Sequence, residues 1–229
     1  MNIAIILSGG VGSRLGGSIP KQYIEVNNRP ILDWCVSTFA GRTDIAKIVI
    51  VVAQKWLDYV KEHTSHYTKS IIYADAGETR QYSIFNGLKE AMASGCSSDD
   101  IVIIHDAARP LVKNKTIDDC SRGVEEGFDG VMPALRVKDT MYVSNDGRTI
   151  SSLLDRGCLR AGQAPESFRL GSYLALHDNM PREELLNING STELAFKAGQ
   201  NVKIVDGDED NFKITTPEDL VRFKQVVNG

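Results

Sequence analysis

The chain has 229 residues, which is enough for one sizeable α/β domain and too few for two comfortable ones. Its net charge of −4 argues against nucleic acid or an anionic membrane as the main partner, so an anion site must be local. Four scattered cysteines without a C-x-x-C pair argue against a disulfide framework and a structural zinc site. Together with the lack of a signal peptide and of a membrane-spanning apolar run, they predict a cytoplasmic protein.

Apolar runs typical of buried strands alternate along the chain with helix-like stretches. The expected strands are Ile3–Leu7, Lys47–Val52, Ser70–Tyr73, Ile101–His105, Gly130–Pro133 and Asn201–Val205. The expected helices are Ile31–Phe39, Lys55–His63, Arg80–Ala93 and Asn114–Glu126, and a last one that starts at Pro217 after Thr216 as N-cap. This alternation predicts one α/β domain over residues 1–229, Rossmann-like, with a mostly parallel mixed sheet.

Residues 136–154 interrupt the alternation with two strand-like runs around Asn145-Asp146-Gly147. Such a pairing of turn residues between strands is a strong hairpin signal, because they accept the positive φ of a tight turn. We therefore expect a β-hairpin inserted into the α/β domain. From the residues alone it is either a local decoration or an arm that makes contacts elsewhere.

A glycine-rich turn follows the first expected strand and contains Ser8, Gly9, Gly10 and Gly12. Glycines let backbone N–H groups approach an anion closely, and Arg14 and Lys21 add two cations nearby. The dinucleotide fingerprint fails because its third glycine position holds Leu15, and a Walker A loop fails because Lys21 follows Pro20. The turn is therefore either another kind of cradle for a nucleoside triphosphate or a strand-to-helix turn without a ligand.

The segment Ile101–Pro110, I-V-I-I-H-D-A-A-R-P, places Asp106 and Arg109 directly after a buried strand. In open α/β sheets ligands bind beyond the carboxyl ends of the strands, so both side chains are expected at the mouth of a site. Mg²⁺ prefers carboxylate and phosphate oxygens, and one aspartate with triphosphate oxygens suffices to hold it. The alternative is a surface salt bridge between Asp106 and Arg109.

Two further segments carry polar residues that suit a phosphate site. Gly77–Ser83, G-E-T-R-Q-Y-S, opens an expected helix, whose N-terminus offers unpaired N–H groups and a positive dipole end. Asn211–Thr215, N-F-K-I-T, places Lys213 between apolar residues late in the chain. Taken alone, the first is equally compatible with helix capping and the second with a solvated lysine at a sheet edge.

These segments match four motifs in order and spacing: L-S-G-G-x-G-S-R-x-G…P-K-Q-Y, G-x-x-R-x-x-S, H-D-A-A-R-P and N-F-K-I-T. On these motifs the chain resembles, over nearly its whole length, the cytidylyltransferases that act on methylerythritol 4-phosphate or ribitol 5-phosphate. The resemblance implies an enzyme that converts CTP and a polyol phosphate to a CDP-polyol and pyrophosphate, with Mg²⁺ as cofactor. The acceptor phosphate is already ionised, so catalysis is mainly alignment and charge stabilisation.

The resemblance also implies a role for each matched residue. The catalytic cations would be Arg14, Lys21 and Lys213. The nucleotide contacts would be Ser8, Gly9, Gly10, Gly12, Gly77, Arg80, Ser83 and Asp106, and Asp106 would also bind the metal. The acceptor contacts would be Arg109, Thr140 and Arg156. The 136–154 hairpin would be an arm that clasps a second subunit of a homodimer and brings residues to its site.

The acceptor side departs from the family's pattern in two places. The family's T-P-Q is Ala164-Pro165-Glu166 here, and its later T-D motif is replaced by Asn189-Gly190-Ser191-Thr192-Glu193. Gly162-Gln163 before Ala164 resembles the G-Q-T-P of the ribitol-phosphate enzymes, which favours ribitol 5-phosphate or a related alditol phosphate of capsule or teichoic-acid biosynthesis. One alternative is methylerythritol 4-phosphate of isoprenoid biosynthesis. Others are a nucleotidyltransferase using another nucleotide on a sugar 1-phosphate, and a nucleotide-binding protein with weak catalysis.

Overall fold

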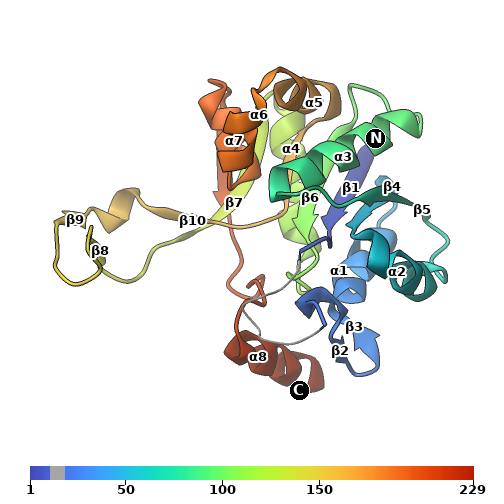
Figure 1. The fold of residues 1–229 in the computed structure, drawn as a ribbon, viewed down its shortest axis with the longest axis horizontal. Coiled ribbons are helices and arrows are strands. Elements are labelled where there is room, and N and C mark those ends of the chain that lie inside the picture. The colour runs from blue at the N-terminus through green and yellow to red at the C-terminus, as the bar shows by residue number, and fades with distance from the viewer. Residues whose placement is uncertain (11–18) are drawn as a thin grey trace.

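The computed structural model describes residues 1–10 and 19–229 and builds them around one twisted sheet (Figure 1). Among these residues the sheet has eight strands: β1 (Asn2–Leu7), β4 (Ile45–Val52), β5 (Ser70–Asp75), β6 (Ile101–Asp106), β7 (Gly130–Arg136), β10 (Arg160–Gly162), β11 (Glu166–Arg169) and β12 (Val202–Asp206).

Most strand pairs of this sheet are parallel. The strands β5, β4, β1 and β6 lie side by side in parallel, and β12 pairs in parallel with β7. Between β6 and β7, β11 runs antiparallel to both, and β10 continues the antiparallel pairing along β7. The predicted mostly parallel mixed sheet is therefore confirmed, and β10 and β11 are strands that the apolar pattern does not predict.

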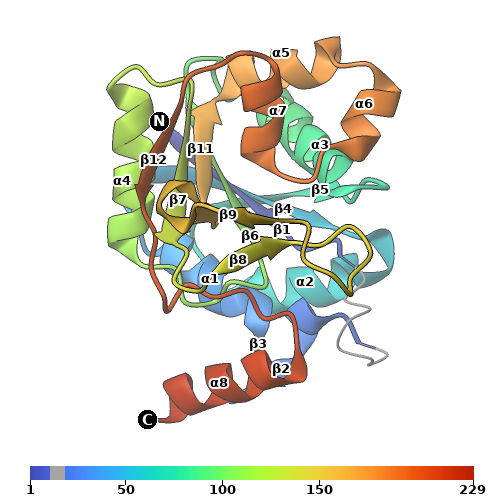
Figure 2. The same cartoon turned by 90° about the vertical axis from the view of Figure 1, so that its left-hand side faces the viewer.

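Helices cover both faces of the sheet (Figures 1 and 2). One face carries α1 (Ile31–Ala40), α2 (Leu57–Thr64) and α4 (Asn114–Glu125); the other carries α3 (Arg80–Ala93), α5 (Leu170–Asn179), α6 (Arg182–Asn187) and α7 (Ser191–Lys197). Along β1, Ala4 and Ile6 pack with the first group and Ile3 and Ile5 with the second. Within the described residues, no helix is long and apolar enough to cross a membrane.

The last helix, α8 (Pro217–Asn228), packs the end of the chain against its beginning. Thr216 is its N-cap as predicted, in a capping box with Asp219. Phe223 of α8 packs with Ile214 against the residues around β2 (Glu25–Val26) and the start of α1. This contact holds the segment that carries Lys213 beside the N-terminal part of the chain.

The predicted hairpin is present as an arm that projects from the body of the molecule (Figures 1 and 2). Its strands β8 (Met141–Val143) and β9 (Ser152–Leu154) pair antiparallel. The turn is wider than the Asn-Asp-Gly signal indicates, because residues 144–151 all lie between the two strands. Inside this loop Asp146 accepts hydrogen bonds from the backbone N–H groups of Arg148 and Thr149. Apolar side chains of the arm, such as Tyr142 and Leu153, are exposed.

Candidate active site

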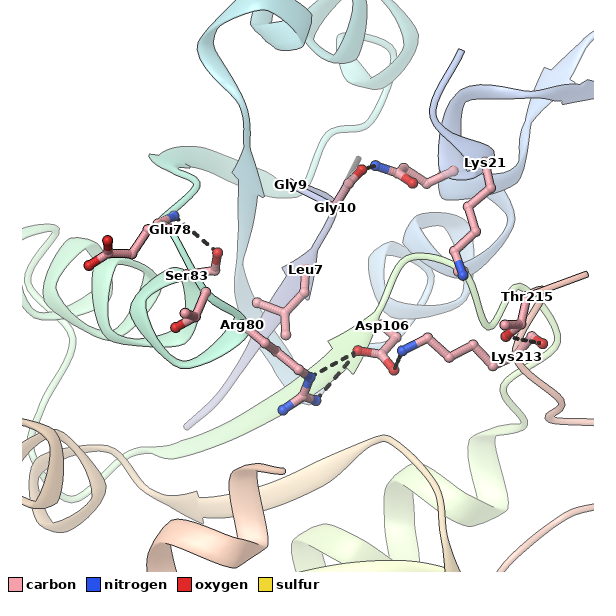
Figure 3. A pocket seen from close by; sticks show the side chains of 14 residues that line it. Leu7, Gly9, Gly10, Lys21, Glu78, Arg80, Ser83, Asp106, Lys213 and Thr215 are labelled. Carbon is pink, nitrogen blue, oxygen red and sulfur yellow. Dashed lines mark hydrogen bonds and ion pairs between the residues drawn. The ribbon is translucent and has the colours of Figure 1, made fainter. Parts of the chain in front are cut away.

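A pocket of about 420 Å³ opens at the carboxyl ends of β1 and β6 (Figure 3). Its walls come from segments far apart in the sequence: the glycine turn, the start of α3, the loop after β6 and the segment before α8. The predicted site residues that line it are Gly9, Gly10, Lys21, Gly77, Arg80, Ser83, Asp106 and Lys213. Two other predicted residues, Gly12 and Arg14, lie outside the described part of the chain.

Two glycines of the pocket wall lie where a side chain has no room: Gly9 against the turn before α3, and Gly77 against the first turn of α3 itself. A Cβ on Gly9 would lie 2.3 Å from the Cβ of Ala76, and a Cβ on Gly77 would lie 2.3 Å from that of Tyr82. The backbone N–H of Gly77 also donates a hydrogen bond to Ser83 Oγ at 3.0 Å. Gly9 therefore lets the turn after β1 pack against the turn before α3, and Gly77 lets its own turn fold tightly onto α3.

Gln22 and Tyr23, which the sequence analysis did not single out, hold the glycine turn from the short helix η2 (Lys21–Tyr23). The side-chain amide of Gln22 donates to the carbonyl oxygens of Ser8 at 2.6 Å and Gly10 at 2.7 Å. The Ser8 hydroxyl is buried and lies 2.8 Å from the Tyr23 hydroxyl, so it is directed away from the pocket that Gly10 lines. The C=O and N–H of a trans peptide bond point in opposite directions, and the Ser8 C=O faces Gln22. The backbone N–H of Gly9, in the same peptide bond, therefore faces away from Gln22.

Asp106 lies at the centre of a cluster of cations (Figure 3). Lys213 Nζ is 2.8 Å from its Oδ2, Arg80 Nε and Nη2 are each 3.4 Å from its Oδ1, and Arg109 Nε is 3.7 Å from its Oδ2. Burial alone raises the pKa of a carboxyl, but Arg80, Lys213 and Arg109 outweigh it and hold the pKa of Asp106 well below its usual range. The carboxylate therefore stays ionised at any working pH.

Lys21 and Lys213 reach this pocket from opposite ends of the chain. Lys21 extends from η2, and Figure 3 shows its ammonium directed toward the Asp106 side of the pocket. The Lys213 segment is tied to the loop after β6 by the backbone N–H of Ile214, which donates to the carbonyl oxygen of Ala108 at 2.8 Å. The two lysines predicted to be catalytic thus face the same cavity, where they can oppose the charge of a triphosphate.

Arg80 links Asp106 to a second carboxylate that the sequence analysis did not assign to the site. Its Nη2 lies 3.2 Å from Oε2 of Glu166, and its Nη1 donates to Ser191 Oγ at 2.7 Å. Burial lowers the pKa of an arginine, but the two carboxylates outweigh it and raise the pKa of Arg80 above its ordinary value. Glu166 starts β11, and its register opposite Ile104 of β6 places it beside the end of that strand.

The three predicted acceptor contacts do not meet in the pocket of a single chain. Arg109 is mostly buried, donates to the carbonyl oxygen of Asn211 at 2.7 Å and is not among the described residues that line the pocket. Thr140 and Arg156 are exposed on the arm, where Arg156 donates to the carbonyl oxygen of Lys138. The arm projects away from the body of the chain that carries the pocket (Figure 1).

Gln163, on which the preference for an alditol phosphate rested, is buried under the loop before Lys213. Its Nε2 donates to the carbonyl oxygen of Asp208 at 2.9 Å, and its Oε1 accepts from the Asp208 N–H at 3.0 Å. Nearby, Asn211 Nδ2 donates to the carbonyl oxygen of Ala164 at 2.7 Å. Gln163 therefore shapes this loop and is not among the described residues that line the pocket.

The donor set at Asp106 suits a metal ion only in part. Among the described residues, no group of three or more histidine, cysteine, aspartate and glutamate side chains could hold a metal by itself. Mg²⁺, however, often uses one or two carboxylates and completes its shell with water and substrate phosphates. The ionised carboxylate of Asp106 in a phosphate-sized pocket fits such an ion when a nucleotide supplies the other oxygens.

Comparisons with known proteins identify the family of the chain. A family model described as 2-C-methyl-D-erythritol 4-phosphate cytidylyltransferase (IspD) matches residues 2–228. A ribitol-5-phosphate cytidylyltransferase of Streptococcus agalactiae is 34% identical over 232 residues, covering 100% of this chain and 96% of that protein. A 2-C-methyl-D-erythritol 4-phosphate cytidylyltransferase of Geobacillus thermodenitrificans is 34% identical over 226 residues, covering 98% of this chain and 96% of that protein.

A solved structure shows the same architecture. The 2-C-methyl-D-erythritol 4-phosphate cytidylyltransferase of Francisella tularensis has a TM-score of 0.82 to this chain at 28% identity, and the match covers 98% of both chains. The fold, the four motifs and the full-length relatives therefore agree on the class of enzyme. The chain belongs to the 2-C-methyl-D-erythritol 4-phosphate cytidylyltransferase (IspD) family and is a cytidylyltransferase.

Proposed function

We propose that this protein transfers the cytidylyl group of CTP to ribitol 5-phosphate, or to a closely related alditol phosphate, and releases pyrophosphate. The observation that carries the proposal is the convergence of Lys21, Asp106 and Lys213 from three distant motifs in one pocket. Cations around a fixed carboxylate suit a polyphosphate substrate whose charge shifts during the reaction. The streptococcal relative, which is matched over its nearly full length, is named for ribitol 5-phosphate.

The reaction needs no side chain to remove a proton. A phosphate oxygen of the acceptor, already ionised at neutral pH, attacks the α-phosphorus of CTP. The bond from that phosphorus to the β-phosphate oxygen breaks, and its electron pair leaves with pyrophosphate. Lys21 and Lys213 stabilise the negative charge that gathers around the α-phosphate.

The pairing of Lys213 with Asp106 allows both groups to serve the substrate. The two side chains are 2.8 Å apart, and Lys213 is 35% exposed, so its flexible chain can turn from the carboxylate to a phosphate oxygen. Arg80 and Arg109 still neighbour Asp106 at 3.4 and 3.7 Å. Asp106 would hold Mg²⁺, which when bound would offset charge on the triphosphate and on the departing pyrophosphate.

The choice of acceptor is the finer part of the proposal. The streptococcal relative named for ribitol 5-phosphate and the Geobacillus relative named for methylerythritol 4-phosphate are both 34% identical to this chain. What favours an alditol phosphate is Gly162-Gln163, which resembles the corresponding segment of the ribitol-phosphate enzymes. Ala164 replaces a threonine that both groups of enzymes have, and an acceptor hydroxyl left unpaired there costs roughly 1–3 kcal/mol with either acceptor.

The test is pyrophosphate release with each of CTP, UTP, GTP and ATP, and then kcat/KM for both acceptors with the preferred nucleotide. We expect turnover with CTP and a higher kcat/KM for ribitol 5-phosphate. A tenfold preference for methylerythritol 4-phosphate would replace the proposed acceptor and leave the cytidylyl transfer intact. Turnover confined to another nucleotide with a sugar 1-phosphate would overturn the proposal as a whole.

The arm supports a homodimer as the working form. An isolated two-stranded hairpin is marginal in water, and this one exposes apolar side chains, with Tyr142 56% and Leu153 64% exposed. A second subunit that covers the arm would bury them, and would receive Thr140 and Arg156 beside its own pocket. We propose this arrangement, in a cytoplasmic enzyme, as the form in which the acceptor contacts are completed.

A further inference from the structure

The two places where this chain departs from the family's motifs are in direct contact. Glu166 stands where the family has glutamine, and Thr192 lies in the segment that replaces the family's T-D motif. Oε1 of Glu166 accepts hydrogen bonds from the backbone N–H of Thr192 at 3.0 Å and from its hydroxyl at 3.1 Å. The other carboxylate oxygen faces Arg80 Nη2 at 3.2 Å. The carboxylate is therefore fixed on one side by α7 and presents its charge to Arg80 on the other.

Arg80 divides its charge between two carboxylates. It is closer to Glu166, at 3.2 Å, than to Asp106, at 3.4 Å, and Ser191 Oγ accepts from its Nη1 at 2.7 Å. The Glu166 side chain is 7% exposed, so little solvent screens its charge. Without that charge Asp106 would be the nearest counter-charge of Arg80 among the described residues.

We infer that Glu166 is a positioning residue that holds Arg80 partly away from Asp106 and so keeps the Asp106 carboxylate available to a nucleotide-bound cation. The inference rests on the proposed function, because it concerns how the same site receives CTP with Mg²⁺. A carboxylate already neutralised by arginine is a poorer ligand for a metal ion. Arg80 and a metal ion thus compete for the Asp106 carboxylate, and Glu166 weakens the hold of Arg80 on it while leaving Arg80 in the wall of the pocket.

The inference predicts two opposite effects of Glu166→Gln. The amide has the same size and can still accept hydrogen bonds from Thr192, but the buried negative charge is gone. The pocket becomes more positive, so CTP without metal should bind about threefold tighter or more. Arg80 is then drawn to Asp106, so the gain in CTP affinity on adding Mg²⁺ should shrink by about threefold or more.

Calorimetric titration of the intact protein with CTP, once in EDTA and once in excess Mg²⁺, measures both quantities without turnover. Glu166→Asp keeps the negative charge but moves it farther from Arg80. It should therefore raise the CTP affinity in EDTA and reduce the gain on adding Mg²⁺, as Glu166→Gln does, but by smaller factors. Thr192→Val is the matched control, because it removes one hydrogen bond to Glu166 and leaves the charge. Its two affinities should stay within about twofold of wild type.

A merely structural role for Glu166 would weaken CTP binding in both buffers, and this result would overturn the inference. The inference would also be overturned if wild type, Glu166→Gln and Glu166→Asp had the same two CTP affinities. The same holds if Thr192→Val changed these affinities as much as Glu166→Gln does. Failure of the wild-type protein to bind CTP in either buffer would count against the proposed function itself. The two failures are therefore distinguishable.

Discussion

Replacing Lys213 by alanine separates its contribution to catalysis from its contribution to folding. Lys213 donates to Asp106 at 2.8 Å, but its side chain is 35% exposed. Asp106 keeps Arg80 at 3.4 Å and Arg109 at 3.7 Å after the substitution, so its charge is not left without partners. A partly exposed ion pair of this kind contributes at most about 1 kcal/mol to folding stability.

The loss in the transition state should be larger. The α-phosphate gathers negative charge as pyrophosphate leaves, and Lys213 is one of two described lysines directed into the pocket. Removing one donor or cation from such a site costs about 3 kcal/mol in the barrier. That corresponds to a roughly hundredfold lower kcat. Activity should therefore fall far more than stability.

The assay is pyrophosphate release at saturating CTP and acceptor, with urea unfolding of the same sample. Lys113→Ala is a matched control, because Lys113 Nζ also lies 2.8 Å from an aspartate, Asp208, but on the surface outside the pocket. It should leave kcat unchanged. If Lys213→Ala keeps kcat within threefold of wild type while folding normally, Lys213 does not stabilise the transition state.

Three more predictions concern the glycine turn, the arm and the response to pH. Gln22→Met removes the amide that donates to the Ser8 and Gly10 carbonyls, so the KM for CTP and the inhibition constant of pyrophosphate should both rise about tenfold. An unchanged KM for CTP would show that CTP binding does not need this amide. Deleting residues 142–149 should give monomers by light scattering, and a wild-type protein that is monomeric at micromolar concentration would contradict the dimer. Burial lowers the pKa of His105 and of His177 to about 4, so the unfolded chain binds more protons than the native one between about pH 6.5 and 4. The free energy of unfolding measured in urea should therefore fall as the pH drops through this window, by up to about 1.4 kcal/mol per pH unit for each histidine. His177→Gln should reduce this slope. A free energy of unfolding that stays constant from pH 7 to 5 would show that the two histidines do not have lowered pKa values in the folded protein.

Elements whose signal is local could be predicted from the sequence. β1 is a continuous apolar run because both of its faces are covered, and α8 starts where Thr216 and Pro217 indicate. The strand β11 could not be predicted in this way. It has four residues, and two of them are charged. It forms a strand because its backbone pairs with the edge of β6 on one side and with the edge of β7 on the other.

Local patterns predict the strand–helix order, the glycine turn and the residue types of a phosphate site, because each depends on neighbours within a few positions. The side chains that share the pocket are set by the packing of distant segments. This packing turns the Ser8 hydroxyl toward Tyr23, buries Gln163 under the loop before Lys213, and places Glu166 against Arg80. These contacts join residues far apart in the chain, and sheet register and helix packing, which no local pattern encodes, set their geometry.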